Sequence, residues 1–307
     1  MYHGIEFYNL SQAMVNGIWP LVMAGREAVG DTEAPPALLQ VRRGRAEAPA
    51  WYMVQAMEFH PEPLSVARLR VRDTYAAPKL VAALLEMLAS EGWLRPGREG
   101  EYHLTAAGLA QGEKMTRRMA RWLEGQAEPL GEDEMGQLEG YFEKVIHLWL
   151  DEQVPPGNWC LRYSRRRAPE AEAPRLARLI QYSADFNAYR DDAHMAAWRP
   201  YQLEGYVWEA FAFVCGGKAE TAHDIYQALL YRGYSEYAFA GALAQLVAKG
   251  WLVAEGDVHQ VTEDGWAVRE DVEIATNHYF YAGWDDLFHE EELTRFSELL
   301  VALRDAK

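Results

Sequence analysis

Cysteine is scarce in this sequence, and long apolar runs are missing from it. Only Cys160 and Cys215 occur among the 307 residues, without C-x-x-C spacing. This pattern argues against a disulfide framework or a structural zinc site, and it fits a reducing compartment. No apolar run reaches the roughly 18 residues that a membrane-spanning helix needs, and the first ten residues lack the regions of a signal peptide. We therefore expect a cytoplasmic protein with no membrane partner.

The sequence also lacks the short motifs of common enzyme sites. It contains no phosphate-binding loop, no dinucleotide-binding glycine pattern, no nucleophile elbow and no series of metal ligands. Residue types that can bind metals do occur together near the C-terminus, at His278, Asp285, Asp286 and His289. No pair of them has H-x-x-x-H spacing, and a solvated acidic helix start accounts for them better. We therefore expect no metal and no cofactor, and catalysis is the less favoured class of function.

Basic residues are too few to balance the acidic ones, and the imbalance is uneven. The formal net charge is −16, yet residues 1–126 carry 14 basic and 14 acidic side chains. Residues 206–307 carry 7 basic and 18 acidic side chains. A nucleic-acid backbone would be repelled by this last third unless a local basic patch overrides the repulsion. Contact with DNA is therefore expected mainly in the first half of the chain.

Two short stretches far apart in the chain share one pattern. "LASEGWL" and "LVAKGWL" each end a run of apolar residues at three-to-four spacing with a glycine and a tryptophan. Gly92 and Gly250 stand where a glycine ends a helix in the left-handed conformation, and a hairpin pattern follows each of them. These glycines are 158 residues apart, as are Met135 and Leu293 in two acidic helix starts downstream. Agreement of several features at one offset predicts an internal duplication.

Each copy is expected to contain three helices, a two-stranded wing and further long helices. The first two helices are predicted in "WYMVQAMEF" and "LSVARLRV" of one copy, and in "VWEAFAFV" and "AHDIYQALL" of the other. Pro78 falls near the first position of the third helix in copy one, and Ser235 is a natural N-cap for it in copy two. Thr105 and Thr262 stand at the N-cap of the helix after each wing. Between the copies, "RYSRRRAPEAEAP" is expected to be a solvated loop and "RLARLIQYSADFNAYRDDAHMAAW" one or two helices.

The expected fold class is mainly α with small β-hairpin wings, in which two winged helix-turn-helix domains of one chain form a pseudo-dimer. The proposed segments are an N-terminal helical segment (1–47), a first winged-helix repeat with long C-terminal helices (48–149), connector helices with a basic and acidic loop (150–205), and a second winged-helix repeat with C-terminal helices (206–307).

The duplicated pattern resembles a known family. The stretches "LASEGWLRPGREGEYHLTAAG" with "LGEDEMGQLEGYF", and "LVAKGWLVAEGDVHQVTEDG" with "LFHEEELTRFSELL", are similar to MarR-type winged helix-turn-helix proteins over roughly two thirds of the chain. Those proteins are usually shorter homodimers whose terminal helices pair, so a fused duplicate resembles a pseudo-dimer within one chain. The resemblance implies a transcriptional regulator that binds double-stranded DNA and responds to a small-molecule effector. Arg190, Asp192 and His194 also resemble an R-x-D-x-H stretch in a poorly characterised group of bacterial helix-turn-helix proteins.

The candidate recognition helices carry few side chains that could read base edges, for which Arg, Asn or Gln are typical. Their outward positions are expected to be Lys79, Ala82, Ala83 and Glu86 in the first copy, and Tyr237, Ala240, Gly241 and Ala244 in the second. The basic residues around the first motif and its wing are the candidate phosphate contacts. They are Arg68, Arg70, Arg72, Lys79, Arg95 and Arg98. The alternative is a solvated face balanced by nearby carboxylates such as Asp73, Glu99 and Glu101.

A candidate ligand site lies in the connector, where Arg190, Asp192, His194 and Trp198 could line a pocket for an anionic or aromatic ligand. The alternative is that Asp192 caps a helix and His194 is partly exposed. The run Arg165 to Arg167 could reach a minor groove, but the acidic residues that follow favour a charge-balanced linker.

Two further functions stay open at this stage. The small, neutral outward faces and the acidic last third favour a winged-helix module that has lost DNA binding and binds a small molecule or a protein partner instead. An enzyme that uses the segment from Arg190 to His194 is a third alternative. The leucine-rich C-terminal helix could also pair two chains in a homodimer.

Overall fold

The computed structural model describes residues 17, 20, 48–151 and 159–306. The expected N-terminal segment, 1–47, lies outside the described residues except at two positions, and so does the part of the connector at 152–158. The chain divides into two compact units. The first, here the helical unit, contains Gln111–Asp192 and Tyr279–Lys307, and the second, here the hairpin unit, contains Ala193–His278 and the described part of Pro35–Ala110.

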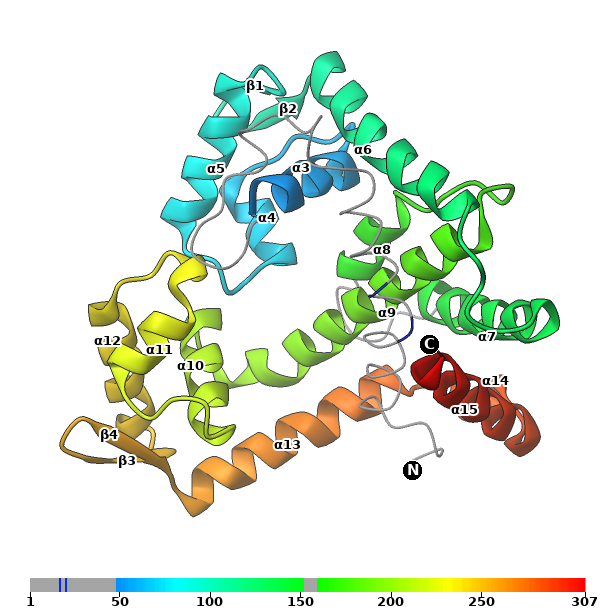
Figure 1. Cartoon of the computed structure of the whole chain (residues 1–307). Coiled ribbons are helices and arrows are strands. Elements are labelled where there is room, and N and C mark those ends of the chain that lie inside the picture. Colours follow the sequence, from blue (N-terminus) through cyan, green and yellow to red (C-terminus); the bar gives the residue numbers. More distant parts are fainter. Residues whose placement is uncertain (1–16, 18–19, 21–47, 152–158, 307) are drawn as a thin grey trace. The chain divides into compact units, whose positions relative to one another are not determined.

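The hairpin unit begins with three helices and a small antiparallel hairpin (Figure 1). The elements are α3 (Ala48–Phe59), α4 (Val66–Arg72), α5 (Pro78–Ser90), β1 (Leu94–Pro96) and β2 (Tyr102–Leu104), after which α6 (Ala106–Glu124) starts. Helix α5 forms because its apolar residues recur at three-to-four spacing and are all buried, namely Leu80, Val81, Leu84, Leu85 and Leu88. In the hairpin, Leu94 lies opposite Leu104.

The same order of elements follows in the second part of the hairpin unit (Figure 1). The elements are α10 (Gly205–Cys215), α11 (Ala222–Ala228), the 3-10 turn η5 (Leu230–Arg232), α12 (Glu236–Ala248), β3 (Leu252–Glu255) and β4 (Val258–Val261), after which α13 (Glu263–Phe280) starts. Leu252 lies opposite Val261 in this hairpin. The predicted fold class, mainly α with two small β-hairpins, is therefore confirmed.

The predicted ends of α5 and α12 are confirmed, and their geometry is the same. Gly92 and Gly250 have φ values of 77° and 76°, in the left-handed region that favours glycine. The Trp93 N–H donates to the Leu88 carbonyl at 3.1 Å, and the Trp251 N–H donates to the Leu246 carbonyl, also at 3.1 Å. These bonds satisfy carbonyl groups that would otherwise be left open at a helix end.

The predicted threonine caps of α6 and α13 are confirmed as well. The Thr105 hydroxyl donates to the Gly92 carbonyl at 2.8 Å and accepts from the Gly108 N–H at 3.0 Å. The Thr262 hydroxyl makes the corresponding bonds to Gly250 at 2.6 Å and from Gly265 at 3.1 Å. Each threonine therefore joins the end of one helix to the start of the next across the hairpin. The predicted Pro78 at the start of α5 and the Ser235 cap of α12 are also present.

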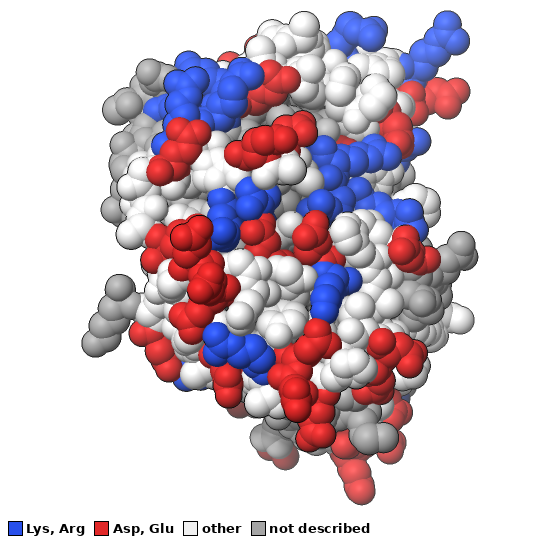
Figure 2. Space-filling view, turned by 90° about the vertical axis from the view of Figure 1, so that its right-hand side faces the viewer, with Lys and Arg blue, Asp and Glu red and all other residues white. Residues whose placement is uncertain are grey.

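The helical unit contains long helices packed around an aromatic core. Its elements are the later part of α6, then α7 (Glu132–Asp151), α8 (Trp159–Arg165), most of α9 (Arg175–Trp198), the end of α13, α14 (Trp284–Leu287) and α15 (Glu290–Asp305). Trp149 is fully buried, stacks on Tyr189 with ring centroids 4.0 Å apart, and donates its indole N–H to the Phe280 carbonyl. Acidic side chains crowd the surface of α7 and α15 in Figure 2, as expected from the acidic first turns of both helices.

The expectation of a solvated loop after residue 161 is wrong at its start. Residues 162–165 are the last part of α8, and α9 is one continuous helix. Ser164 is fully buried, and its hydroxyl donates to the Asp185 carboxylate at 2.6 Å. Arg165 pairs with the other oxygen of that carboxylate at 2.9 Å. A basic run that looks like a linker in the sequence is therefore folded against α9 because a buried carboxylate needs its donors.

Both cysteines are free thiols, and Cys160 is buried. Burial raises the pKa of the Cys215 thiol to about 11, so it stays protonated at neutral pH. In the described ranges, no helix combines the length and the apolar character that crossing a membrane requires.

Candidate nucleic-acid interface

The helix pair α4 and α5, the first of the two candidate helix-turn-helix motifs, exposes a narrow charged edge. Lys79, Ala83 and Glu86 are exposed on α5, whereas Ala82 is half-buried. One cation, one methyl group and one carboxylate thus make up the outward face of the helix in the recognition position. Such a face offers little hydrogen bonding to base edges, but Lys79 at the helix start can reach a phosphate.

The six candidate cations fall into two groups. Arg68, Arg70 and Arg72 each pair with a carboxylate, at 3.3 Å to Glu62, 3.1 Å to Glu204 and 3.5 Å to Glu58. Lys79, Arg95 and Arg98 are exposed, and among the described residues none of the three has an ion-pair partner. The structure therefore offers α5 and the β1–β2 wing, rather than α4, as the place where cations are available to an external anion.

The second motif, α11 and α12, presents a different surface. Tyr237 is 88% exposed at the start of α12, and the small residues Ala240, Gly241 and Ala244 behind it are exposed too. The β3–β4 wing ends in exposed Glu255 and Asp257. The side chains named here include no cation to neutralise a phosphate and two carboxylates that repel one.

The turns of the two helix-turn-helix motifs pack against each other within the hairpin unit. Arg232, in the turn before α12, pairs with Asp73 in the turn before α5 at 3.2 Å, and its carbonyl accepts from the Ala77 N–H at 2.8 Å. The guanidinium also makes a two-pronged ion pair with Glu209 of α10, with a shortest distance of 2.7 Å. Although burial by itself lowers the pKa of Arg232, the carboxylates of Glu209 and Asp73 raise it above its usual value. Arg232 is thus a permanently charged link between the two motifs.

The four candidate ligand residues lie along α9, and each has contacts of its own within its unit. The guanidinium of Arg190 lies over the Phe280 ring, 5.5 Å from its centroid. The Asp192 carboxylate accepts from the N–H groups of Cys160 and Leu161, both at 3.0 Å, at the start of α8. Arg190 and Asp192 belong to the helical unit, whereas His194 and Trp198 belong to the hairpin unit.

His194 is part of a hydrogen-bond chain that joins three helices. The indole N–H of Trp208 donates to His194 Nε2 at 3.0 Å. Because an indole can only donate, Nε2 carries no proton, and the ring proton of the neutral side chain lies on Nδ1, 3.2 Å from the Thr276 hydroxyl. The Thr276 hydroxyl in turn donates a hydrogen bond to the Val272 carbonyl at 2.6 Å. The partners of His194 therefore come from α10 and α13, and this geometry uses both of its ring nitrogens.

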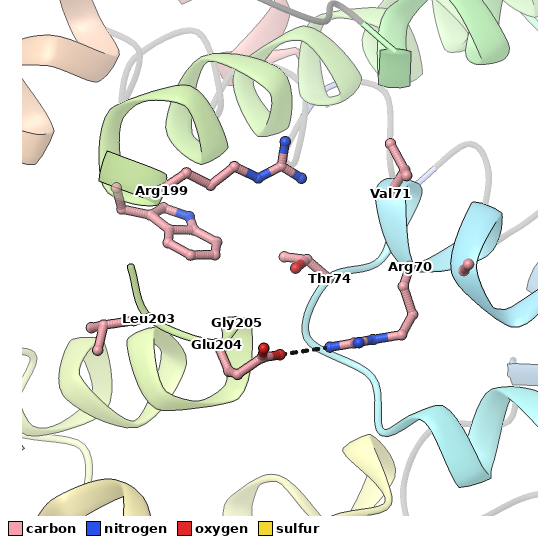
Figure 3. A pocket seen from close by; sticks show the side chains of 9 residues that line it. Arg70, Val71, Thr74, Arg199, Leu203, Glu204 and Gly205 are labelled. Carbon is pink, nitrogen blue, oxygen red and sulfur yellow. Dashed lines mark hydrogen bonds and ion pairs between the residues drawn. The ribbon is translucent and has the colours of Figure 1, made fainter. Parts of the chain in front are cut away.

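Trp198 lines a cavity of about 220 Å³ in the hairpin unit. The other residues of the wall come from α4, from the turn after it and from the start of α10: Ala67, Arg70, Val71, Thr74, Arg199, Leu203, Glu204 and Gly205. Figure 3 shows Arg199 reaching from one wall toward the wall of Val71 and Thr74, and shows Arg70 and Glu204 meeting across the other side. This cavity is a candidate small-molecule site within the described residues.

Sequence reasoning missed the residues that connect the first motif to the second part of the hairpin unit. Arg232 and Asp73 are 159 residues apart, and Arg70 and Glu204 are 134 residues apart. No local pattern marks such pairs, because each residue alone has the character of a solvated charge. Arg199 was also missed, although it directly follows Trp198.

Comparison with known proteins gives one match. Residues 165–306 match a family described as a helix-turn-helix family. This range contains α11, α12 and the second hairpin, so the match supports a helix-turn-helix domain at the place where the structure has one. Comparisons with curated proteins and with solved structures found no match.

Proposed function

We propose that this chain is a MarR-like winged-helix transcription regulator in which residues 48–149 and 206–307 are two copies of one unit that form a pseudo-dimer. The observation that supports the duplication best is the pair of threonine caps, in which Thr105 and Thr262 make the same two hydrogen bonds in the two hairpins. The helix-turn-helix match over residues 165–306 supports DNA binding as the general function.

The pairing of α7 with α15 supports the pseudo-dimer. Each of these helices follows one winged-helix repeat, and MarR-type dimers use terminal helices in the same way. Tyr141 stacks on Phe296 with ring centroids 5.1 Å apart. Lys144 pairs with Glu292 at 2.7 Å, and Arg295 donates to Gln137 at 3.0 Å. Gln137 and Arg295 are themselves separated by the repeat offset of 158.

DNA contact is proposed mainly through the first repeat. Lys79, Arg95 and Arg98 are exposed cations that have no ion-pair partner among the described residues, and they supply phosphate contacts on α5 and the wing. Arg68, Arg70 and Arg72 join them only by leaving their carboxylates. Since the outward face of α5 offers few donors to bases, binding is expected to depend more on charge and DNA shape than on direct readout of bases.

The test is duplex binding as a function of salt. A variant with Lys79→Ala, Arg95→Ala and Arg98→Ala is expected to bind genomic duplex fragments more weakly, and the slope of log affinity against log salt is expected to fall by about 2.7. Fluorescence anisotropy at salt concentrations from about 25 to about 200 mM measures both the affinity for the duplex and the slope of its logarithm against log salt.

The matched control removes two exposed cations from the second repeat, with Lys218→Ala and Lys249→Ala, and is expected to leave the slope nearly unchanged. Equal losses in the two variants would contradict contact mainly through the first repeat. No duplex binding by the unaltered chain at low salt would reject the DNA-binding function.

A second candidate function is a module that binds a protein partner instead of DNA. It is favoured by the exposed, uncharged surface of α12, with Tyr237 at its start and Ala240 and Gly241 behind it. In this case Ala240→Trp should abolish capture of a defined partner, while Glu86→Ala on the corresponding face of α5 should retain it. Tight, salt-dependent duplex binding together with unchanged capture by the Ala240→Trp variant would reject this alternative.

A further inference from the structure

The cavity beside Trp198 has more hydrogen-bond donors than acceptors among its side chains. Arg70 and Arg199 are donors, the Thr74 hydroxyl can donate or accept, and Glu204 is the one carboxylate among the residues of its wall. Trp198 is 1% exposed and contributes apolar ring surface to the wall. The charged side chains of the wall are therefore two guanidinium groups and one carboxylate.

The two guanidinium groups of the wall differ in how they are held. Arg70 pairs with Glu204 at 3.1 Å, but the Glu204 side chain is 66% exposed, so water weakens this pair. Arg199 is exposed, and its contact among the described residues is to the sulfur of Met195 at 3.5 Å. An incoming anion thus finds one cation without a carboxylate and a second whose carboxylate is easily displaced.

The rest of the wall is apolar. Leu203 is buried, and Val71 and the indole of Trp198 add flat or branched hydrocarbon surface. A cavity with an apolar wall and a few converging polar groups is typical of small-molecule sites. Its volume, about 220 Å³, suits a compact organic molecule rather than a nucleotide.

We propose that this cavity binds a small organic anion, a carboxylate or a phosphate ester with a short apolar body, and that the anion replaces Glu204 at Arg70 while Arg199 closes over it. The proposal names the ligand class of the ligand-responsive regulator proposed above. Only the regulatory effect of ligand binding rests on that proposed function. Arg70 belongs to α4 of the first motif, and Glu204 precedes α10 of the second part of the unit. Exchange of the partner of Arg70 therefore breaks one of the links between the first motif and the second part of the hairpin unit.

The binding test uses the free protein without DNA. Isothermal titration with butyrate, benzoate and phenyl phosphate, each against its uncharged counterpart butyramide, benzamide or phenol, measures whether the charge is recognised. We expect the anions to bind more tightly than the uncharged molecules, and the comparison of benzoate with phenyl phosphate distinguishes a carboxylate site from a phosphate site. Equal affinity for the charged and uncharged members of every pair would overturn the proposal.

Three variants locate the site. Arg199→Met is expected to weaken anion binding on the order of tenfold, because a hydrogen bond to a charged group is lost. Glu204→Gln is expected to tighten it about two- to fivefold, because the competing carboxylate is removed. Lys218→Met removes one exposed charge from the same unit outside the cavity and is expected to leave anion binding unchanged.

Anion binding and duplex binding are measured separately, so that the two proposals can fail independently. Weaker anion binding in Glu204→Gln than in the unaltered protein would overturn the proposal, as would equal losses in Arg199→Met and Lys218→Met. If Arg199→Met lowers duplex affinity while no anion binds, the arginine contacts DNA phosphate and the cavity is not a ligand site. If anions bind as expected but no duplex is bound, the site stands and the DNA-binding function fails.

Discussion

Replacing Arg232 with methionine is expected to lower the free energy of unfolding by about 3–5 kcal/mol. The guanidinium is the shared partner of Glu209 and Asp73, whose side chains are only 12% and 16% exposed. Methionine keeps the length of the side chain but leaves two carboxylates facing each other in a poorly solvated place. Breaking a buried ion pair on one side costs more than the pair contributes, because the remaining charge has no compensation. Urea denaturation followed by tryptophan fluorescence measures the loss.

Two further variants test whether the uncompensated carboxylates cause the loss of stability. In Arg232→Met with Glu209→Met, one of the two carboxylates is gone, and stability should recover partly. Arg295→Met removes an arginine that also bridges two elements, but its side chain is 37% exposed and its carboxylate partner Glu134 is 42% exposed. This control is expected to cost about 1 kcal/mol or less. A loss in Arg232→Met no larger than in Arg295→Met would contradict the role assigned to Arg232.

Replacing Gly265 with alanine is expected to lower the free energy of unfolding by about 2 kcal/mol, although alanine is the better helix former. A methyl group at this position would lie 2.2 Å from the Trp251 carbonyl oxygen and 2.9 Å from Val261. The first neighbour is backbone held by the Thr262 N–H at 3.0 Å, so it can move only if the hairpin moves. Gly108 is in the same position against the Trp93 carbonyl, also at 2.2 Å, and should respond alike.

Gly241 provides the matched control for this pair. It lies inside α12, and an added methyl group would meet nothing within 4 Å. Gly241→Ala is therefore expected to stabilise the protein by about 1 kcal/mol through helix propensity. Thermal unfolding of the three variants should give a shift for Gly241→Ala that is opposite to the shifts for Gly108→Ala and Gly265→Ala. A stabilised Gly265→Ala variant would mean that the close approach to Trp251 is absent in solution.

Predictions that depend on neighbouring residues in the chain were the most successful. The glycine stops at Gly92 and Gly250 and the caps at Thr105 and Thr262 are all confirmed. Each arises from groups within about five positions of one another, so the pattern is visible in the sequence. The hairpins were predicted for the same reason, because turn residues between short alternating runs mark them.

The region after residue 161 shows the limit of such reasoning. "RYSRRRAPEAEAP" has the composition of a linker, yet Ser164 and Arg165 are folded against α9. Their partner, Asp185, is 20 and 21 residues away and fully buried. Burial raises the pKa of Asp185 above its ordinary value, and the donors of Ser164 and Arg165 act against that rise. Composition cannot reveal which charges lose their water on folding.

The sequence by itself determined the helices, their caps and the two hairpins, because these depend on hydrogen bonds and apolar spacing within a few residues. It also determined where cations occur, but not which of them are available. Only the tertiary structure decided that Arg70 and Arg232 are held by carboxylates 134 and 23 residues away, while Arg95 and Arg98 are not. The physical reason is that the energy of a charge depends on its nearest partners and on its exposure to water, and folding sets both.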